Sequence, residues 1–440
     1  MGREYLQENK WWVSPYNFVD EVAGQFDLPQ TVEIHDATLR DGEQTPGVVF
    51  RKDDKVRIAE MLDEVGVERI EAGMPAVSEE DFEAIKAISK LGLKAKIFTF
   101  ARALPVDIDK AVDCGAHGVV VEIPIGYPKL KHQFGWTWQD VLRKSVDCIN
   151  YAREKNLYTV YFPYDTTRAR DEDLTNLLTR IMAESPPDSI GVVDTMGCAL
   201  PEAIKYMVRK VKKLTGLPVE IHTHNDFGMG VATELAAVTA GAEVVHSCIS
   251  GLGERTGNAA LEELMVGLQV LLGFNTNYKF DKILSLCKLA EELSGVKPAT
   301  NKPVIGTGNY TRESGIGVDL VMKNPLAMFA TAPQFFGREG EVVLGKKSGK
   351  ASITYTLEKL GIQNVSDDAV LDILKEVKQK GTEKRALLTT EEFKEIVDRT
   401  DGKVSDRLDV TAGAMSIEDY PGLTATQLEI LADMEDGPTE

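Results

Sequence analysis

Short runs of apolar, mostly β-branched residues recur at regular intervals through the first two thirds of this chain, and a helical pattern follows each of them. The eight runs lie at 31–35, 69–73, 94–100, 118–125, 158–164, 189–195, 219–225 and 243–249. They lack strict apolar/polar alternation, which is typical of parallel strands buried on both faces. Eight such strands alternating with helices over about 245 residues predict an α/β fold, namely a (β/α)8 barrel.

The intervening helical patterns support this architecture. They lie at 53–65, 79–91, 107–114, 137–155, 171–184, 200–214, 229–241 and 258–273. In the first, one apolar stripe at helical spacing consists of Val56, Ala59, Met61–Leu62 and Val65. A doubly wound open sheet is the alternative, but such a sheet usually carries a glycine-rich phosphate loop after its first strand. No such loop follows residues 31–35.

The rhythm changes after about residue 275. We therefore expect an N-terminal extension at 1–30, the barrel at 31–275, a linker and subdomain at 276–355 that contacts a partner subunit, and a helical C-terminal subdomain at 356–440. Helical patterns are expected at 281–294, 366–379 and 390–399, and residues 400–440 read as an acidic, loosely packed tail.

Composition excludes several classes of protein. The 440 residues carry a formal net charge of −19, which argues against nucleic-acid binding. No apolar run reaches the roughly 18 residues of a membrane span, and the N-terminus lacks the pattern of a secretory signal. The five cysteines are scattered without CxxC spacing, which is typical of reduced thiols. We therefore expect a cytoplasmic protein.

The first expected strand ends in the sequence HDATLRDGEQTPG (35–47), which places Arg40 beside Asp41. Reactive groups of such barrels lie at the carboxyl ends of the strands. A carboxylate beside an arginine offers one metal ligand and one cation that polarises a carbonyl group. A buried structural ion pair is the plainer interpretation. Gln44, three residues further on, is a candidate for substrate contact.

The seventh expected strand ends in HTHND (222–226). His222 and His224 are two residues apart, so both side chains leave the same face of the strand. Two imidazoles on one face are suited to a divalent metal, although two packed histidines are the alternative. The chain has only six histidines, and the pairing of two of them at a strand end favours metal binding.

Further candidates follow other strands. After the eighth strand, the loop SGLGERTGN is rich in glycine, and Asn258 is expected to begin a helix there, although a plain capped loop is the commoner explanation. Arg102 and Arg168 follow the third and fifth strands and are candidates for binding a carboxylate-bearing substrate. Glu71, at the end of the second strand, is a candidate base, water-positioning group or arginine partner.

These motifs, in this order, resemble the DRE-TIM metallolyase family, in particular its acyl-CoA-condensing branch of isopropylmalate, homocitrate, citramalate and Re-type citrate synthases. The resemblance is strong over about residues 30–275 and extends more weakly to about 355 through ESGIG and LGKKSGK. It implies that Asp41, His222 and His224 bind one divalent metal ion and that Arg40 polarises the substrate carbonyl. It further implies that Asn258 lies near the metal and that Thr195 contacts an oxo-acid substrate.

The sequence departs from that branch at several positions. Gly317 stands where the synthases usually have a histidine, and Phe329 lies near the place of an accompanying tyrosine. The fifth strand reads VYFPYD (160–165) without the usual glutamate. Glu254–Arg255 replaces the cysteine of the lyase branch, which disfavours cleavage of an acyl-CoA by that route. The substrate is therefore not expected to be the branched oxo acid of leucine biosynthesis.

The resemblance implies a Claisen condensation of acetyl-CoA with a 2-oxo acid, catalysed by a transferase that uses Mn²⁺, Zn²⁺, Co²⁺ or Mg²⁺. Oxaloacetate is the expected substrate, which would yield citrate, because the extra arginines suit a dicarboxylate. Homocitrate synthesis from 2-oxoglutarate and citramalate synthesis from pyruvate are the alternatives. A catalytically silent barrel that binds an acyl-CoA or an oxo acid and regulates a partner is an alternative of another class. A homodimer is expected from the same resemblance.

Overall fold

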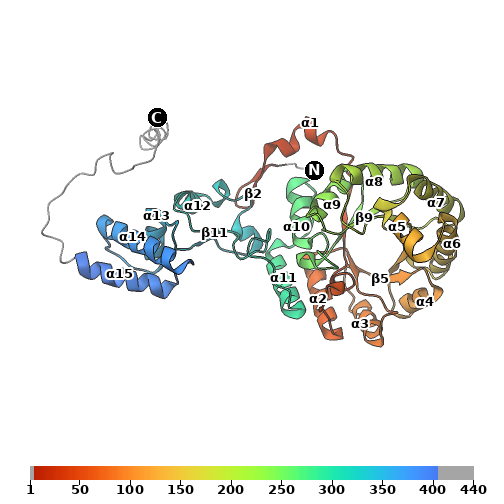
Figure 1. Ribbon diagram of the computed structural model, residues 1–440, viewed down its shortest axis with the longest axis horizontal. Helices are drawn as coiled ribbons and strands as arrows, with labels where there is room; N and C mark the ends of the chain where they lie inside the picture. Colours follow the sequence, from red (N-terminus) through yellow and green to blue (C-terminus); the bar gives the residue numbers. More distant parts are fainter. Residues whose placement is uncertain (1–3, 405–440) are drawn as a thin grey trace. The chain divides into compact units, whose positions relative to one another are not determined.

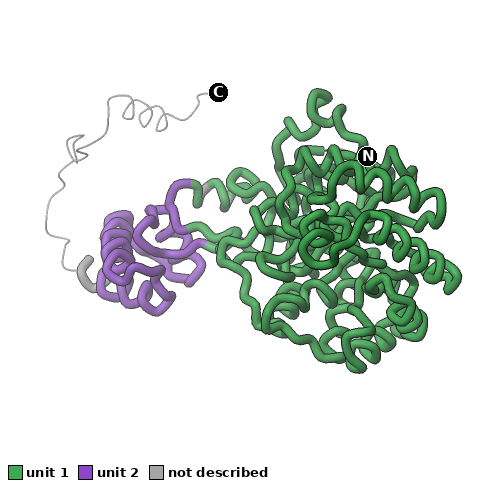
Figure 2. Tube along the Cα trace, turned by 45° about the vertical axis from the view of Figure 1, so that its right-hand side comes forward, with its two compact units in different colours: residues 1–312, 317–341 green, residues 313–316, 342–440 purple. Residues whose placement is uncertain are grey.

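The computed structural model describes residues 4–404 of the chain. These residues form two compact units, drawn in separate colours in Figure 2. Within the described range, the first unit comprises residues 4–312 and Gly317–Glu341, and the second comprises Glu313–Ile316 and residues 342–404. The boundary between the units thus falls near residue 342, ahead of the boundary at 355/356 expected from the sequence.

A closed parallel barrel forms the first unit, in the strand order β10-β3-β4-β5-β6-β7-β8-β9. The strands are β3 Glu33–Asp36, β4 Arg69–Glu71, β5 Lys96–Arg102, β6 Gly118–Pro124, β7 Tyr158–Tyr164, β8 Ser189–Asp194, β9 Val219–Thr223 and β10 Val244–Ser247. The barrel closes where β10 pairs in parallel with β3, His246 lying opposite His35. This confirms the fold expected from the sequence, with strand ends that shift by at most two residues.

Helices surround the barrel (Figure 1). They are α2 Lys52–Val65, α3 Glu79–Ser89, α4 Pro105–Asp113, α6 Trp138–Glu154, α7 Asp171–Glu184, α8 Pro201–Thr215, α9 Gly230–Thr239, α10 Leu261–Val266 and α11 Phe280–Ser294. In α2 the predicted stripe faces the core, with Ala59, Leu62 and Val65 fully inaccessible and Val56 and Met61 partly buried. Among the described helices, none combines the length and the hydropathy needed to cross a membrane.

The barrel interior has an apolar half and a polar half. Six side chains of β5 to β8 form the apolar half: Phe98, Phe100, Val120, Val160, Phe162 and Val193. Six ionisable side chains of β3, β4, β9 and β10 form the polar half: His35, Arg69, Glu71, Glu220, His222 and His246. All of them alternate with residues that face the outer helices, so both sets of side chains point into the barrel interior.

The chain before the barrel forms short elements: β1 Leu6–Gln7, β2 Trp11–Trp12 and α1 Asp20–Ala23. Trp11 is buried, and its ring lies 5.6 Å from the ring of Phe335 in the same unit. Trp12, by contrast, is 46% exposed. Further short helices are α5 Tyr127–Lys129 and α12 Val318–Lys323, and short strands are β11 Thr311–Arg312 and β12 Glu341–Val342.

The second unit has its own helical core. It contains α13 Lys350–Lys359, α14 Asp367–Lys384 and α15 Thr390–Val404. The helices expected at 366–379 and 390–399 are therefore confirmed, and they pack through Ile373, Val377, Phe393 and Ile396. Helix α13 was missed because its apolar face consists of little more than Ile353 and Leu357. The expected tail overlaps α15 as far as residue 404, and its remainder, 405–440, lies outside the described residues.

Candidate metal and active site

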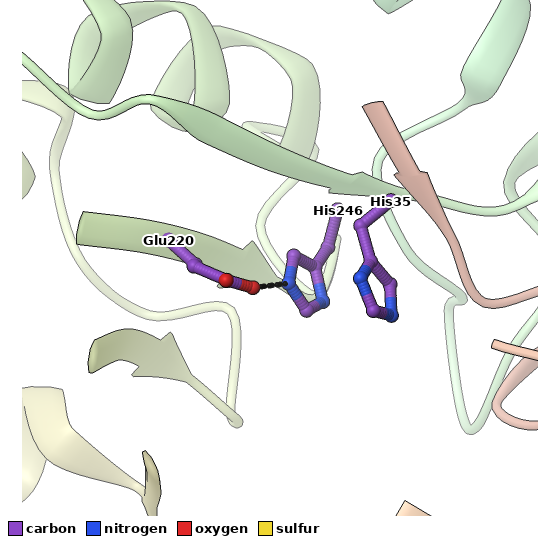
Figure 3. Close-up of side chains that lie close together, drawn as sticks. All are labelled: His35, Glu220 and His246. Atoms are coloured by element: carbon purple, nitrogen blue, oxygen red, sulfur yellow. Dashed lines mark hydrogen bonds and ion pairs between the residues drawn. The ribbon is translucent and has the colours of Figure 1, made fainter. Parts of the chain in front are cut away.

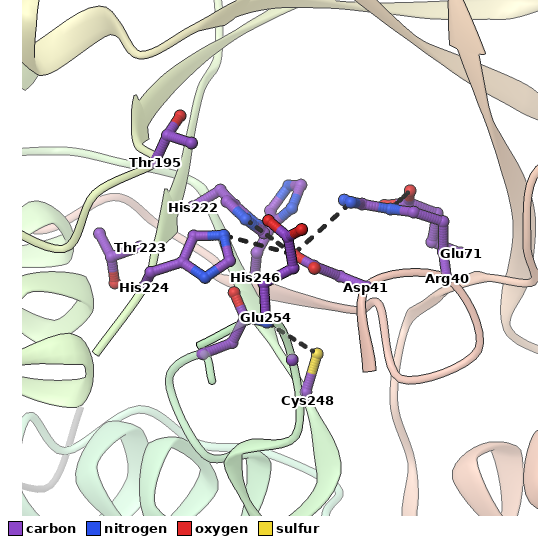
Figure 4. A network of polar contacts seen from close by, with 12 residues as sticks. Arg40, Asp41, Glu71, Thr195, His222, Thr223, His224, His246, Cys248 and Glu254 are labelled. Atoms are coloured by element: carbon purple, nitrogen blue, oxygen red, sulfur yellow. Dashed lines mark hydrogen bonds and ion pairs between the residues drawn. The ribbon is translucent and has the colours of Figure 1, made fainter. Parts of the chain in front are cut away.

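Asp41 and the two histidines of the HTHND motif meet at the carboxyl end of the barrel. The Nε2 atoms of His222 and His224 lie 3.2 and 3.6 Å from Oδ2 of Asp41. His222 belongs to β9 and His224 follows it directly, so strand alternation aims both rings at the loop after β3 that carries Asp41. Figure 4 shows the three side chains converging, with Arg40 approaching Asp41 from the opposite side. The prediction that these residues come together is confirmed.

Electrostatics keep these groups in the protonation states that a cation requires. Burial alone would raise the pKa of Asp41, but Arg40, His222 and His224 hold that pKa well below its usual range. Burial also lowers the pKa of His224 to about 4 and lowers the pKa of His222, although Asp41 opposes both shifts. At neutral pH the site therefore consists of one carboxylate and two neutral imidazoles.

These three side chains fit a divalent metal ion. One ligand atom from each lies within 4.8 Å of the others. Both carboxylate oxygens of Asp41 are buried and have no hydrogen-bond partner among the described residues, which is costly for an ionised group without a ligand. Two atoms that each bind one cation at roughly 2.1 Å lie about 3–3.5 Å apart, close to the distances found here.

Glu71 holds the side chain of Arg40 in place. The Nε of Arg40 donates to Oε1 of Glu71 at 2.5 Å, and Oε2 of Glu71 lies 3.1 Å from Nε2 of His35. Burial would raise the pKa of Glu71, but Arg40 and His35 lower it to about 2, so the carboxylate is ionised. The guanidinium also lies over the ring of Phe100, 4.3 Å from its centroid. Of the roles considered for Glu71, its contacts correspond to that of an arginine partner.

Asn258 does not begin a helix, contrary to the sequence-based expectation. It forms a bridge with His224, and α10 begins only at Leu261, because the backbone around Asn258 pairs with the segments that follow β9 and β10. Its Nδ2 donates to the carbonyl oxygen of Leu252 at 3.0 Å, while Oδ1 is buried without a partner among the described residues. That free oxygen beside His224 agrees with the proximity to the metal that the resemblance implies.

The four residues expected to bind substrate lie in different surroundings. Thr195 is buried, and its Oγ1 accepts a hydrogen bond from the backbone of Asp165 at 2.9 Å. Arg168 pairs with Asp165 at 2.8 Å. Arg102 pairs with Asp107 at 2.9 Å, and its side chain is 54% exposed. Gln44 lies exposed at the end of the 3₁₀ turn Gly42–Gln44. The structure thus supplies both arginines with carboxylate partners of their own.

A second histidine cluster lies in the interior of the barrel. His35 and His246 stack with ring centroids 4.3 Å apart and an interplanar angle of 4°, and Nε2 of His246 lies 3.0 Å from Oε2 of Glu220 (Figure 3). Glu220 also accepts from Arg69 at 2.8 Å. The ring lone pairs lie in the ring planes, so two parallel rings cannot aim at one ion between them. This cluster is therefore a hydrogen-bonded support and not a second metal site.

Sequence reasoning missed the interior-facing residues of the strands. His35, Glu220 and His246 carry the network that supports Arg40, and Glu122 faces the lumen from β6. The available signal was strand alternation: Glu220, His222 and His224 share one face of β9, and Glu122 shares a face with Val120.

Gly317 has a backbone conformation that explains its departure from the family pattern. Its φ is +89°, and a Cβ there would lie 2.9 Å from Cε of Met328. A histidine at this position would therefore be strained in the conformation observed. Phe329 packs against Tyr310, with ring centroids 5.2 Å apart, and Tyr310 bonds to Thr331 through its hydroxyl.

Comparisons with known proteins agree with this geometry. The HMGL-like family matches residues 31–290, and a domain described as homocitrate synthase post-HMGL domain-like matches residues 304–385. The homocitrate synthase AksA of Methanopyrus kandleri is 38% identical over 384 residues, which cover 87% of this chain and 96% of the relative. A putative (R)-citramalate synthase of Archaeoglobus fulgidus is 40% identical, covering 80% of this chain and 72% of the relative. The 2-isopropylmalate synthase of Methanocaldococcus jannaschii is 35% identical, covering 92% and 77%.

Among solved structures, an HMG-CoA lyase from Bacillus subtilis superposes with a TM-score of 0.56 at 21% identity, covering 63% of this chain and 98% of the lyase. That likeness concerns the barrel fold alone, whereas the sequence matches extend through most of the chain. The chain therefore belongs to the HMGL-like family, and within it to the DRE-TIM branch that contains the homocitrate, citramalate and isopropylmalate synthases.

Proposed function

We propose that this protein condenses acetyl-CoA with a 2-oxo acid in a metal-dependent Claisen reaction and then releases free CoA. The observation that carries the proposal is the convergence of Asp41, His222 and His224 beside the Arg40 guanidinium, with both oxygens of Asp41 lacking other partners among the described residues. The names of the relatives, which are synthases of this chemical class, support it.

Each residue has a distinct part in this reaction. A divalent ion held by Asp41, His222 and His224 supplies Lewis acidity at the keto group of the oxo acid. Arg40 faces the same space and stabilises the negative charge that develops on the keto oxygen. Glu71 and His35 fix the orientation of Arg40, so its charge is in place before the reaction begins. One such donor contributes roughly 10²–10³ in rate.

Oxaloacetate is the 2-oxo acid that we propose, with citrate as the product. The departures at Gly317 and in VYFPYD (160–165) separate the chain from the leucine enzymes. 2-Oxoglutarate is the second candidate, because several of the relatives are homocitrate synthases of which the match covers 96–99%. Four residues stay candidates for contact with the oxo acid: Thr195, Gln44, Arg102 and Arg168. The two arginines would have to exchange their present carboxylate partners for the substrate.

A thiol-release assay tests the proposal. The purified protein, supplied with Mn²⁺, Zn²⁺, Co²⁺ or Mg²⁺, is incubated with acetyl-CoA and with oxaloacetate, 2-oxoglutarate, pyruvate or 2-oxoisovalerate in turn. We expect oxo-acid-dependent CoA release that stops on chelation, fastest with oxaloacetate. Fastest release with 2-oxoglutarate would identify a homocitrate synthase instead. A protein that binds these ligands but releases no thiol with any of them would be the silent regulatory barrel.

A further inference from the structure

Glu122 is a carboxyl group that the barrel directs into its own interior. It lies on β6, two residues beyond Val120, which belongs to the apolar cluster inside the barrel. Between them, Val121 packs outward with Cys148 and Ala152 of α6. Because side chains alternate along a strand, Glu122 faces the lumen. It is the last ionisable residue of β6, at the carboxyl end where Asp41 also lies.

Two phenyl rings place Glu122 relative to the site. Its Cα partner on β7 is Phe162, whose ring centroid lies 5.4 Å from that of His222. The ring of Phe100 lies under Arg40 and 6.2 Å from the ring of Phe162. These two rings lie between the guanidinium and the metal-site histidines, and Glu122 lies beside Phe162 on the neighbouring strand.

The charges around Glu122 are those of the same site. Burial raises the pKa of Glu122 above its usual value; Lys129 and Arg40 oppose the shift, and Asp41 and Glu71 add to it. A carboxylate with a raised pKa in a partly desolvated position is a stronger base than one in water.

Several other carboxylates at this end of the barrel are engaged elsewhere. Both oxygens of Glu71 are bonded, to Arg40 and His35. Three aspartates are also bonded: Asp165 to Arg168, Asp194 to Thr167 and the backbone of Ala199, and Asp226 to Arg255. Glu254 is 52% exposed beside Arg255. For Glu122, no described side chain lies within hydrogen-bonding or ion-pair distance of the carboxylate.

We propose that Glu122 is the general base that removes a proton from the methyl group of the acyl thioester; this inference rests on the proposed function. The proton passes from the methyl carbon to a carboxylate oxygen of Glu122. The electron pair of the broken C–H bond forms the new C–C bond to the keto carbon, and the π pair of the keto group moves to its oxygen, beside Arg40. Water then attacks the thioester carbonyl: its hydroxyl group completes the new carboxylic acid and its other proton leaves with the CoA thiol. The proton held by Glu122 passes to the alkoxide oxygen, which restores the carboxylate of Glu122.

The test compares Glu122→Gln and Glu122→Asp with the wild-type protein in the thiol-release assay across pH. General-base catalysis contributes about 10²–10⁴ in rate. We expect kcat of Glu122→Gln to fall by that factor and the acid limb of its pH profile to disappear. Glu122→Asp should keep the limb with partial activity. Metal and oxo-acid binding, measured by calorimetry, should be unchanged in both variants.

Two further variants make the test specific. Glu68→Gln removes another half-buried carboxyl with a raised pKa, at the opposite end of β4, and should keep wild-type kinetics. Glu254→Gln removes the nearest rival carboxylate at the rim. The inference would be overturned if Glu122→Gln kept a kcat near that of wild type, or if it lost only affinity for the oxo acid. It would also be overturned if the acid limb disappeared in Glu254→Gln and not in Glu122→Gln. If Glu122→Gln does not fold, the inference would be overturned by a Glu122→Asp variant that keeps full activity and an unshifted acid limb of the pH profile.

The same assay separates the two levels of the argument. A wild-type protein that releases no thiol with any oxo acid contradicts the proposed function, and the role of Glu122 fails with it. An active wild type with an active Glu122→Gln variant contradicts the role of Glu122 alone.

Discussion

At the scale of single residues, the site depends on side chains that have no alternative partners. Asp41 is surrounded by the guanidinium of Arg40 and the imidazoles of His222 and His224. The charge of Arg40 and the contacts with the two imidazoles keep the Asp41 carboxylate ionised despite its burial. Arg40 in turn is fixed through two different nitrogens, Nε to Glu71 and Nη1 toward Asp41 at 3.5 Å. Such a fork cannot be reproduced by a single ammonium group.

Replacement of Arg40 by lysine should therefore lower kcat more than it changes the KM for the oxo acid. We expect kcat to fall by about 10²–10³, the effect of losing one oriented donor to the developing charge. Steady-state kinetics with saturating metal measure this. Arg209→Lys, at an exposed arginine paired with Asp27, is the matched control and should behave as wild type. An unchanged kcat in Arg40→Lys would remove Arg40 from the mechanism.

Replacement of His224 by alanine should abolish metal-dependent turnover while the fold survives, because the side chain provides one of three ligands and makes few packing contacts. Calorimetric titration with Mn²⁺ and the thiol-release assay measure the two losses, and circular dichroism checks the fold. His117→Ala, at an exposed histidine before β6, serves as the control. Full activity of a metal-stripped His224→Ala protein would contradict the metal assignment.

At the scale of elements, the loops that follow several strands carry the site, and contacts with the adjacent helices hold these loops in place. Glu262, in the first turn of α10, accepts a hydrogen bond from the backbone of Ser250 at 3.0 Å and so anchors the glycine-rich loop after β10. Burial raises the pKa of Glu262 to about 7, although Lys302 opposes the shift. The carboxyl group is thus protonated in the folded state at pH values where it is ionised in the unfolded chain.

The consequence is a pH-dependent stability. Between pH 4.5 and about 7 the folded state binds more protons than the unfolded state, so the free energy of unfolding falls as pH rises through this window. The contribution of Glu262 is at most about 3 kcal/mol. Glu262→Gln should lose this contribution, so urea unfolding at pH 5 and pH 8 should differ less than in wild type. Glu263→Gln, on the same helix, should keep the wild-type dependence; parallel curves for Glu262→Gln and wild type would contradict the prediction.

At the scale of the whole molecule, the barrel and the helical unit are each compact, and the residues of the candidate metal site all belong to the first unit. The family resemblance predicts a homodimer in which the segment after the barrel contacts the partner subunit. Light scattering coupled to size exclusion should therefore give twice the chain mass of 48.4 kDa across a tenfold dilution. A mass of one chain at all concentrations would count against this assembly.

Sequence alone was sufficient to predict the barrel and the convergence of Asp41, His222 and His224, because strand periodicity and strand-end position are local features of the sequence. Eight buried strands can be recognised in the sequence as apolar runs. His222 and His224 are two residues apart at a strand end, so their side chains lie on one face of the strand whatever surrounds them. Arg40 and Asp41 follow the first strand, so they were expected at the carboxyl end of the barrel, where the two histidines also lie.

What only the tertiary structure decided is which groups meet across strands that are distant in the chain. The pairing of Arg102 and Arg168 with carboxylates of their own, the extended conformation of Asn258, and the stacking of His35 on His246 depend on strand register and loop path. The position of Glu122 beside Phe162 has the same origin. Local sequence sets the direction of a side chain along its strand, but closure of the barrel sets its neighbours, because they come from strands whose spacing in space is unrelated to their spacing in sequence.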